Sequence, residues 1–64
     1  MSDDESKEGY IVEYYAVGKS VKVTAIDPAS LREVSIIGSS RASRKHLAKL
    51  AIRKLHYMMD KDKD

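Results

Sequence analysis

Four basic residues at helical spacing are the side chains of this chain best suited to chemistry, and that chemistry is phosphate binding. They are Arg44, Lys45, Lys49 and Arg53. Residues 39–57 contain six basic residues and no acidic one, and positions four apart lie on one side of a helix. Each like-charge pair at that spacing destabilises a helix by about 0.2–0.5 kcal/mol. The uncompensated cations therefore indicate a site for nucleic acid or another polyanion. The alternative is an ordinary solvated helix face, because Lys and Arg are good helix formers.

Catalysis and metal binding have little basis in the sequence. His46 and His56 are ten residues apart, nearly three turns of a helix, which is too far for them to share a metal ion. No acidic residue lies three or four positions from His46, and the serines have no assigned base to activate them. The chain has no cysteine, which excludes thiolate ligands. We expect no catalytic, metal or cofactor site and predict that the protein is not an enzyme.

Charge and apolar content divide the chain of 64 residues into one domain and two tails. Residues 1–8 and 60–64 are charged and lack the apolar residues that a core needs, so both are expected to be disordered. The domain is expected to span residues 9–59. The acidic start has no apolar run typical of a secretory signal, and no apolar run is long enough to cross a membrane. A cytoplasmic location is the expectation.

An apolar and polar alternation with period two predicts strands between Tyr10 and Gly38. Gly18 and Lys19 separate two such runs, and a glycine first in a two-residue loop suits a type II′ hairpin turn. That register pairs Tyr14 with Val23 and Val12 with Ala25. A second turn over residues 27–30 and a four-residue loop then pair Ala25 with Val34 and Val23 with Ile36.

Ser43 is the expected N-cap of a helix over residues 43–59. Arg44 and Lys45 would then lie in its first turn, where the helix dipole disfavours cations by about 0.3–1 kcal/mol each. His46 and His56 would lie with the basic residues on the solvent side. The helix has an apolar face that would cover one side of the sheet, formed by Leu47, Ala48, Ala51, Leu55, Met58 and Met59 with Leu50 and Ile52 at its margins. The predicted fold is α+β, a three-stranded antiparallel meander followed by one C-terminal helix.

One helix cannot cover both faces of a sheet, so a second face should remain open. Its apolar residues would be Ile11, Tyr15, Ile26 and Ile37, with Ile11 directly beside Ile26. A patch of this kind is typical of a contact surface. Unpaired strand edges offer a second route to association. A protein partner, and in particular a homodimer, is therefore predicted.

Three segments resemble a family of short, uncharacterised α-proteobacterial proteins. They are V-K-V-T-A-I-D-P at residues 21–28, E-V-S-I-I-G at 33–38 and R-K-L-H-Y at 53–57. The likeness extends over nearly all of residues 10–58. It implies no activity, because that family is a domain of unknown function.

The order of strands and helix, with Ser43, Arg44 and Lys45 opening the helix, is also similar to the C-terminal part of a double-stranded-RNA-binding domain. In that family an S-K-K-x-A-K run at the start of the helix contacts phosphates across the major groove. Here Arg44 and Lys45 match the first two cations, whereas Ala48 occupies the position of the third. The family's first helix and its minor-groove loop have no counterpart. The resemblance implies a generic phosphate contact alone.

Two classes of function follow from the sequence. The first is a small, non-enzymatic interaction module that self-associates through the open face or a strand edge. The second is a protein that binds nucleic acid or another polyanion through the basic side of the helix.

Overall fold

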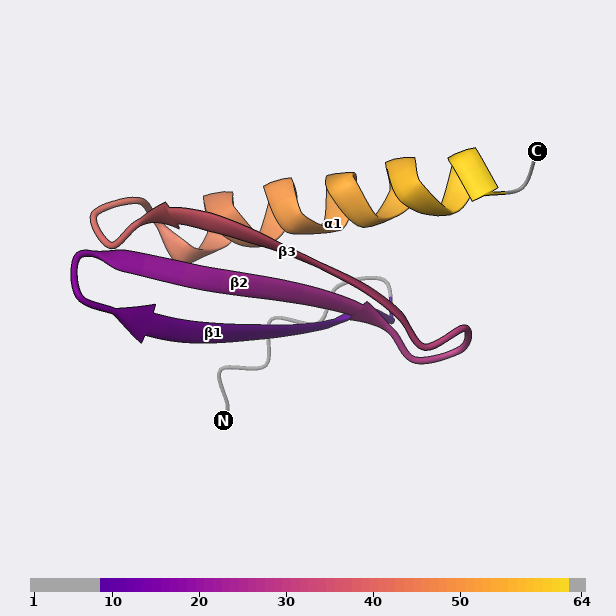
Figure 1. The fold of residues 1–64 in the computed structure, drawn as a ribbon, viewed down its shortest axis with the longest axis horizontal. Helices are drawn as coiled ribbons and strands as arrows, with labels where there is room; N and C mark the ends of the chain where they lie inside the picture. The colour runs from indigo at the N-terminus through magenta and orange to yellow at the C-terminus, as the bar shows by residue number, and fades with distance from the viewer. Residues whose placement is uncertain (1–8, 63–64) are drawn as a thin grey trace.

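Three antiparallel strands and one helix follow one another along the chain in a computed structural model, which describes residues 9–62 (Figure 1). The elements are β1 (Ile11–Val17), β2 (Ser20–Asp27), β3 (Arg32–Ser39) and α1 (Arg44–Asp62). The strands form one sheet in the order β1-β2-β3. The predicted fold class is therefore confirmed. The predicted tails at residues 1–8 and 63–64 lie outside the described residues.

The first hairpin has the predicted register. Tyr14 pairs with Val23 and Val12 pairs with Ala25. Gly18 has a φ of 60°, while Lys19 keeps a negative φ. A type II′ turn requires a positive φ at its first central residue alone, so the glycine is placed where this turn needs it.

The second hairpin also has the predicted register, with Ala25 opposite Val34. Asp27 holds the loop together through its side chain and its backbone carbonyl. The amide of Ala29 donates to Oδ1 at 3.1 Å, and the hydroxyl of Ser30 donates to Oδ2 at 2.9 Å. The amide of Leu31 donates to the Asp27 carbonyl at 2.7 Å. Leu31 closes this loop with a φ of 64°, in the left-handed region.

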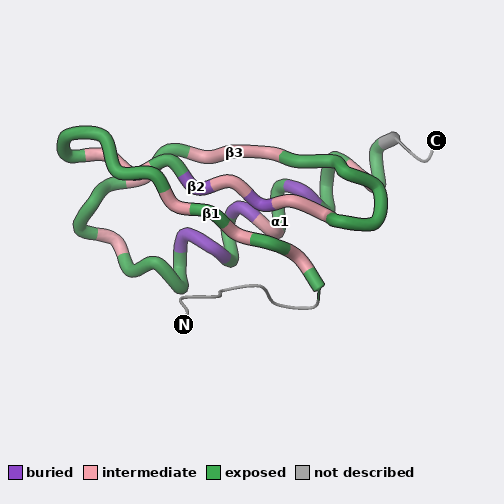
Figure 2. Tube along the Cα trace, turned by 90° about the horizontal axis from the view of Figure 1, so that it is seen from below, coloured by how far each residue is buried: buried purple, intermediate pink, exposed green. Residues whose placement is uncertain are grey.

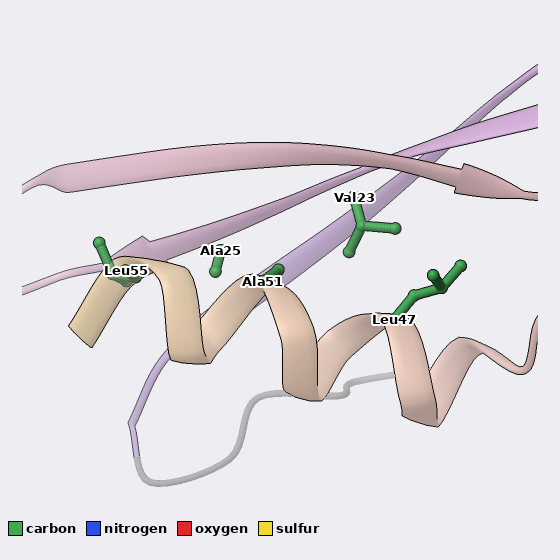
Figure 3. Close-up of a cluster of buried hydrophobic side chains, with 5 residues drawn as sticks. All are labelled: Val23, Ala25, Leu47, Ala51 and Leu55. Atoms are coloured by element: carbon green, nitrogen blue, oxygen red, sulfur yellow. The ribbon is translucent and has the colours of Figure 1, made fainter. Parts of the chain in front are cut away.

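The core lies between the central strand and the helix, which covers one face of the sheet. Val23 and Ala25 point from β2 toward α1, and Leu47, Ala51 and Leu55 point from α1 toward β2 (Figure 3). The buried segments of the chain accordingly lie on these two elements (Figure 2). Burying a side chain the size of valine or leucine contributes about 1.5–3 kcal/mol, so this small cluster supplies much of the stability of the fold.

The helix begins as predicted and ends later than predicted. The Ser43 hydroxyl accepts a hydrogen bond from the amide of His46 at 3.0 Å, which makes it the N-cap. The helix continues to Asp62, so the interpretation of residues 60–62 as part of a disordered tail is wrong. Lys61 suits the negative end of the helix dipole, and its Nζ lies 5.9 Å from the centroid of the Tyr57 ring.

The apolar face of α1 differs from the predicted one toward its C-terminal end. Met58 is 39% exposed, whereas Ile52, expected at the margin, packs against the core. The helix and β3 diverge toward the C-terminus of α1 (Figure 1). The last turns of the helix therefore have less sheet to cover.

Candidate interaction surfaces on the sheet and the helix

The side of the sheet opposite α1, here called the open sheet face, carries the outward-pointing residues of all three strands. Strand residues alternate between the two faces, and the inward set forms the core. The outward set comprises Ile11, Glu13, Tyr15, Val17, Ser20, Lys22, Thr24, Ile26, Glu33, Ser35, Ile37 and Ser39.

Large apolar side chains on this face are exposed to solvent. Tyr15 and Ile37 are each 68% exposed and Ile11 is 43% exposed, while Ile26 on the central strand is half-buried. The predicted interaction residues thus lie together on one face. Ile11 and Ile26 are direct cross-strand partners, as expected.

Strand pairing arranges the outward residues in rows that run across the sheet. Four rows contain one residue from each strand in the order β1, β2, β3: Val17, Ser20, Ser39; then Tyr15, Lys22, Ile37; then Glu13, Thr24, Ser35; then Ile11, Ile26, Glu33. The last three rows contain the charged residues of this face. The hydroxyls of Thr24 and Ser35 are 2.8 Å apart and share a hydrogen bond. A polar row therefore separates two rows that each combine apolar residues with one charge.

The outer edge of β3 is in contact with the helix. Lys54 donates a hydrogen bond from Nζ to the backbone carbonyl of Ser35 at 3.2 Å. A carbonyl used in this way is not available to pair with an added strand, and a lysine at a strand edge opposes such pairing.

Three of the four predicted phosphate-binding residues lie together on the solvent side of α1. Lys45, Lys49 and Arg53 are exposed, and within residues 9–62 they make no ion pair or side-chain hydrogen bond. We call these three residues the basic helix stripe. Their spacing of four places them along one side of the helix.

Arg44, the fourth predicted residue, faces the sheet. Its guanidinium carbon lies 4.8 Å from the centroid of the Tyr14 ring, and the Tyr14 hydroxyl donates to the Arg44 carbonyl at 3.2 Å. Arg44 is exposed but lies apart from the basic helix stripe, and a phosphate contact at Arg44 stays a prediction. Arg44 precedes the buried residues Ala48 and Ala51 by four and seven positions, the signal that assigns it to the sheet side. The cation–π contact offsets part of its unfavourable position in the first turn.

His56 is exposed, as expected, and it also contacts Tyr10, the residue immediately before β1. Its Nε2 is 2.8 Å from the Tyr10 hydroxyl, and the two rings meet edge to face with centroids 5.1 Å apart. His46 contributes its backbone amide to the N-cap. In the described part of the chain, no group of three or more His, Asp or Glu residues is placed to hold a metal ion.

The fold and its two exposed surfaces define a small α+β domain. The chain belongs to a family described as Domain of unknown function (DUF6898), whose model matches residues 7–62. The resemblance to an uncharacterised family is confirmed at this level. No curated protein and no solved structure matches the chain. No helix within residues 9–62 combines the length and apolar character needed to cross a membrane.

Proposed function

We propose that this protein is a small, non-enzymatic interaction module that self-associates through the open sheet face. The observation that carries the proposal is the exposure of several large apolar side chains on one face, with Tyr15 and Ile37 on either side of Lys22 and Ile11 directly beside Ile26. Scattered exposed apolar residues are normal on a soluble surface, whereas a contiguous group is typical of a contact site.

The size of the domain supports the same proposal. A chain of 64 residues buries only about 60% of the surface that its unfolded state exposes. A second copy packed on the open sheet face adds burial that the single helix cannot supply. The first strand, β1, has the other outer edge of the sheet, which offers edge pairing as a different route to the same self-association.

Sedimentation velocity over a range of protein concentrations tests this function. We expect the wild-type protein to shift from monomer toward dimer as its concentration rises, and Ile26→Lys, on the central strand of the open sheet face, to remain monomeric. Leu31→Lys is the matched control, because Leu31 is exposed at the tip of the second hairpin and away from the open sheet face. A wild-type protein that stays monomeric at every concentration would contradict self-association.

Binding of a polyanion is the second candidate function, and the basic helix stripe favours it. Lys45, Lys49 and Arg53 have no ion-pair partner within residues 9–62 and follow the helix at a regular spacing. The similarity to the C-terminal part of double-stranded-RNA-binding domains supports a phosphate contact at Lys45, the one matched cation that belongs to the basic helix stripe. Three neutralised phosphates predict a slope of log K against log salt near about −2.7 for duplex DNA.

An amide chemical-shift titration with a short RNA duplex, at low and at high salt, distinguishes the two candidates. Polyanion binding predicts salt-sensitive shifts along the basic helix stripe that the double variant Lys45→Glu, Lys49→Glu abolishes. Apolar self-association is nearly insensitive to salt and depends on the open sheet face instead. An unchanged spectrum would eliminate the polyanion candidate.

The proposal includes a cytoplasmic location in an α-proteobacterium. The lack of cysteine is compatible with a reducing compartment, since the fold requires no disulfide. Fractionation of cells that express the tagged protein tests the location.

A further inference from the structure

We infer that the partner on the open sheet face is a second copy of this chain with its strands antiparallel to those of the first, so that Lys22 of each copy meets Glu33 of the partner subunit. This inference rests on the proposed self-association and specifies its geometry. It makes the face selective for its own copy through charge as well as through apolar contact.

The position of the two charges on the sheet carries the inference. Lys22 shares a row with Tyr15 and Ile37, and Glu33 shares a row with Ile11 and Ile26. The polar row through Thr24 lies between them. The two charged rows are four residues apart along the strands, about 13 Å at the usual rise per residue.

Symmetry then decides which residues meet. A two-fold axis that crosses the strands at the Thr24 row reverses the strand direction and exchanges the two charged rows. Tyr15 then lies over Ile11 of the partner subunit, and Lys22 lies over Ile26 of the partner subunit. Glu33 of the partner subunit is one strand to the side, about 4.8 Å, which the long lysine side chain can span. An axis that runs along β2 instead places Lys22 on Lys22 of the partner subunit, an unfavourable like-charge contact.

The two charges are available for such a contact. Neither Lys22 nor Glu33 makes an ion pair or a side-chain hydrogen bond within the described residues, and both are exposed. A charge that becomes covered by a partner needs an opposite charge to compensate its lost hydration. The antiparallel arrangement supplies that compensation twice, once for each copy.

Glu13 is the one charged residue of the open sheet face that this symmetry places near the same residue, Glu13, of the partner subunit. It lies in the polar row on β1, at the margin of the sheet, and is exposed. Aligned sheets pack at about 30° to one another, so the two Glu13 side chains remain at the hydrated rim. Glu13→Gln is therefore expected to strengthen the association.

The area of the face sets the expected strength. The outward positions extend about 20 Å along the strands and about 10 Å across them. With the side chains included, such a contact buries about 1,000 Å² over both copies, below the range of about 1,200–2,000 Å² typical of stable complexes. We therefore expect a weak dimer that forms in the micromolar range or above.

The edge of β3 is a less suitable site for the second copy. Lys54 already uses the carbonyl of Ser35 on that edge, whereas the open sheet face has no such cover among the described residues. Pairing at the β1 edge is an outcome that the experiment separates, because it would not depend on charges in the middle of the face.

A charge-swap experiment tests the arrangement by sedimentation velocity and native mass spectrometry. Lys22→Glu alone leaves two acids facing each other, and Glu33→Lys alone leaves two lysines facing each other. We expect each variant to associate at least about tenfold more weakly than wild type, since like charges in a contact are strongly disfavoured. An equimolar mixture of the two should recover dimer, as a heterodimer of the two variants. Lys19→Glu, which makes the same charge change in the first turn, should behave as wild type.

Each other result has a distinct meaning. A wild-type protein that remains monomeric overturns the proposed self-association itself. A wild-type dimer whose variants fail to recover on mixing overturns the antiparallel arrangement but leaves self-association intact. If mixing Lys22→Glu with wild type alone restores the dimer, the two-fold axis runs along β2 instead. In that arrangement the new glutamate faces Lys22 of the wild-type copy. Variants that dimerise as wild type does indicate association at the β1 edge.

Discussion

Leu47 of α1 packs against the backbone of Gly38 in β3, where a Cβ atom would require the leucine side chain to move. A Cβ atom at Gly38 would lie 2.5 Å from Cδ2 and 3.3 Å from Cδ1 of Leu47. Gly38 pairs with Val21 on the inner face of the sheet, and Leu47 is buried. The glycine therefore sets how closely the first turns of the helix approach the sheet.

Gly38→Ala is expected to lower the free energy of unfolding by about 1–3 kcal/mol, because the new methyl group overpacks the contact with Leu47. Leu47→Ala should cost about 2–5 kcal/mol on its own. In the double variant the methyl group occupies part of the space that leucine leaves, so the combined loss should be smaller than the sum. Urea unfolding followed by circular dichroism measures all three, and strictly additive losses would contradict this contact.

Ser43→Ala is expected to lower the free energy of unfolding by about 1 kcal/mol, because the N-cap hydrogen bond to the His46 amide is lost. Ser43→Asp should retain or raise stability, since aspartate caps equally well and its charge suits the helix dipole. The gain from aspartate should diminish with added salt. Thermal unfolding at two salt concentrations measures both effects.

Leu31→Asn is expected to raise the free energy of unfolding by up to about 1 kcal/mol. Leu31 has a φ of 64° and an exposed side chain, so leucine has a backbone cost there with little compensating burial. Asparagine tolerates this conformation better. Leu31→Ala keeps the Cβ atom and should not reproduce the gain, which makes it the control in the same denaturation experiment.

Leu55→Ala is expected to remove a large share of the free energy of unfolding, because Leu55 is fully buried in the core. Its cavity costs about 2–5 kcal/mol, while a chain of 64 residues has a total stability of only about 3–10 kcal/mol. Leu50→Ala on the same helix should cost much less, because Leu50 is exposed. Urea unfolding measures both losses, and an equal midpoint for the two variants would contradict the assignment of Leu55 to the centre of the core.

The register of both hairpins could be predicted because two independent signals agree. The turn at Gly18 fixes one pairing, and the alternation of apolar residues rejects any shift by one position. The four-residue loop after Asp27 extends the same alternation to β3. The core residues on β2 and the first half of α1 follow from these patterns.

The remaining features depend on how far apart two elements lie, which periodicity does not encode. Met58 occupies the apolar side of the helical wheel but is exposed, because it lies near the C-terminal end of α1, where the helix and β3 diverge (Figure 1). Arg44 and His56 are polar by type, yet each contacts a tyrosine of the N-terminal part of the chain. The close contact between Gly38 and Leu47 can likewise be seen only once the position of the helix is known. From the sequence, Gly38 is predicted only to end the third strand.

The meander order has a consequence for how the chain reaches its fold. Each strand pairs only with the strand next to it in sequence, so both hairpins can form by closing short loops, on a timescale of about 1–10 μs. The long-range step is the docking of α1 on β2, through Val23 and Leu55. Such low contact order favours rapid folding, with the docking of the helix as the event that makes the transition cooperative.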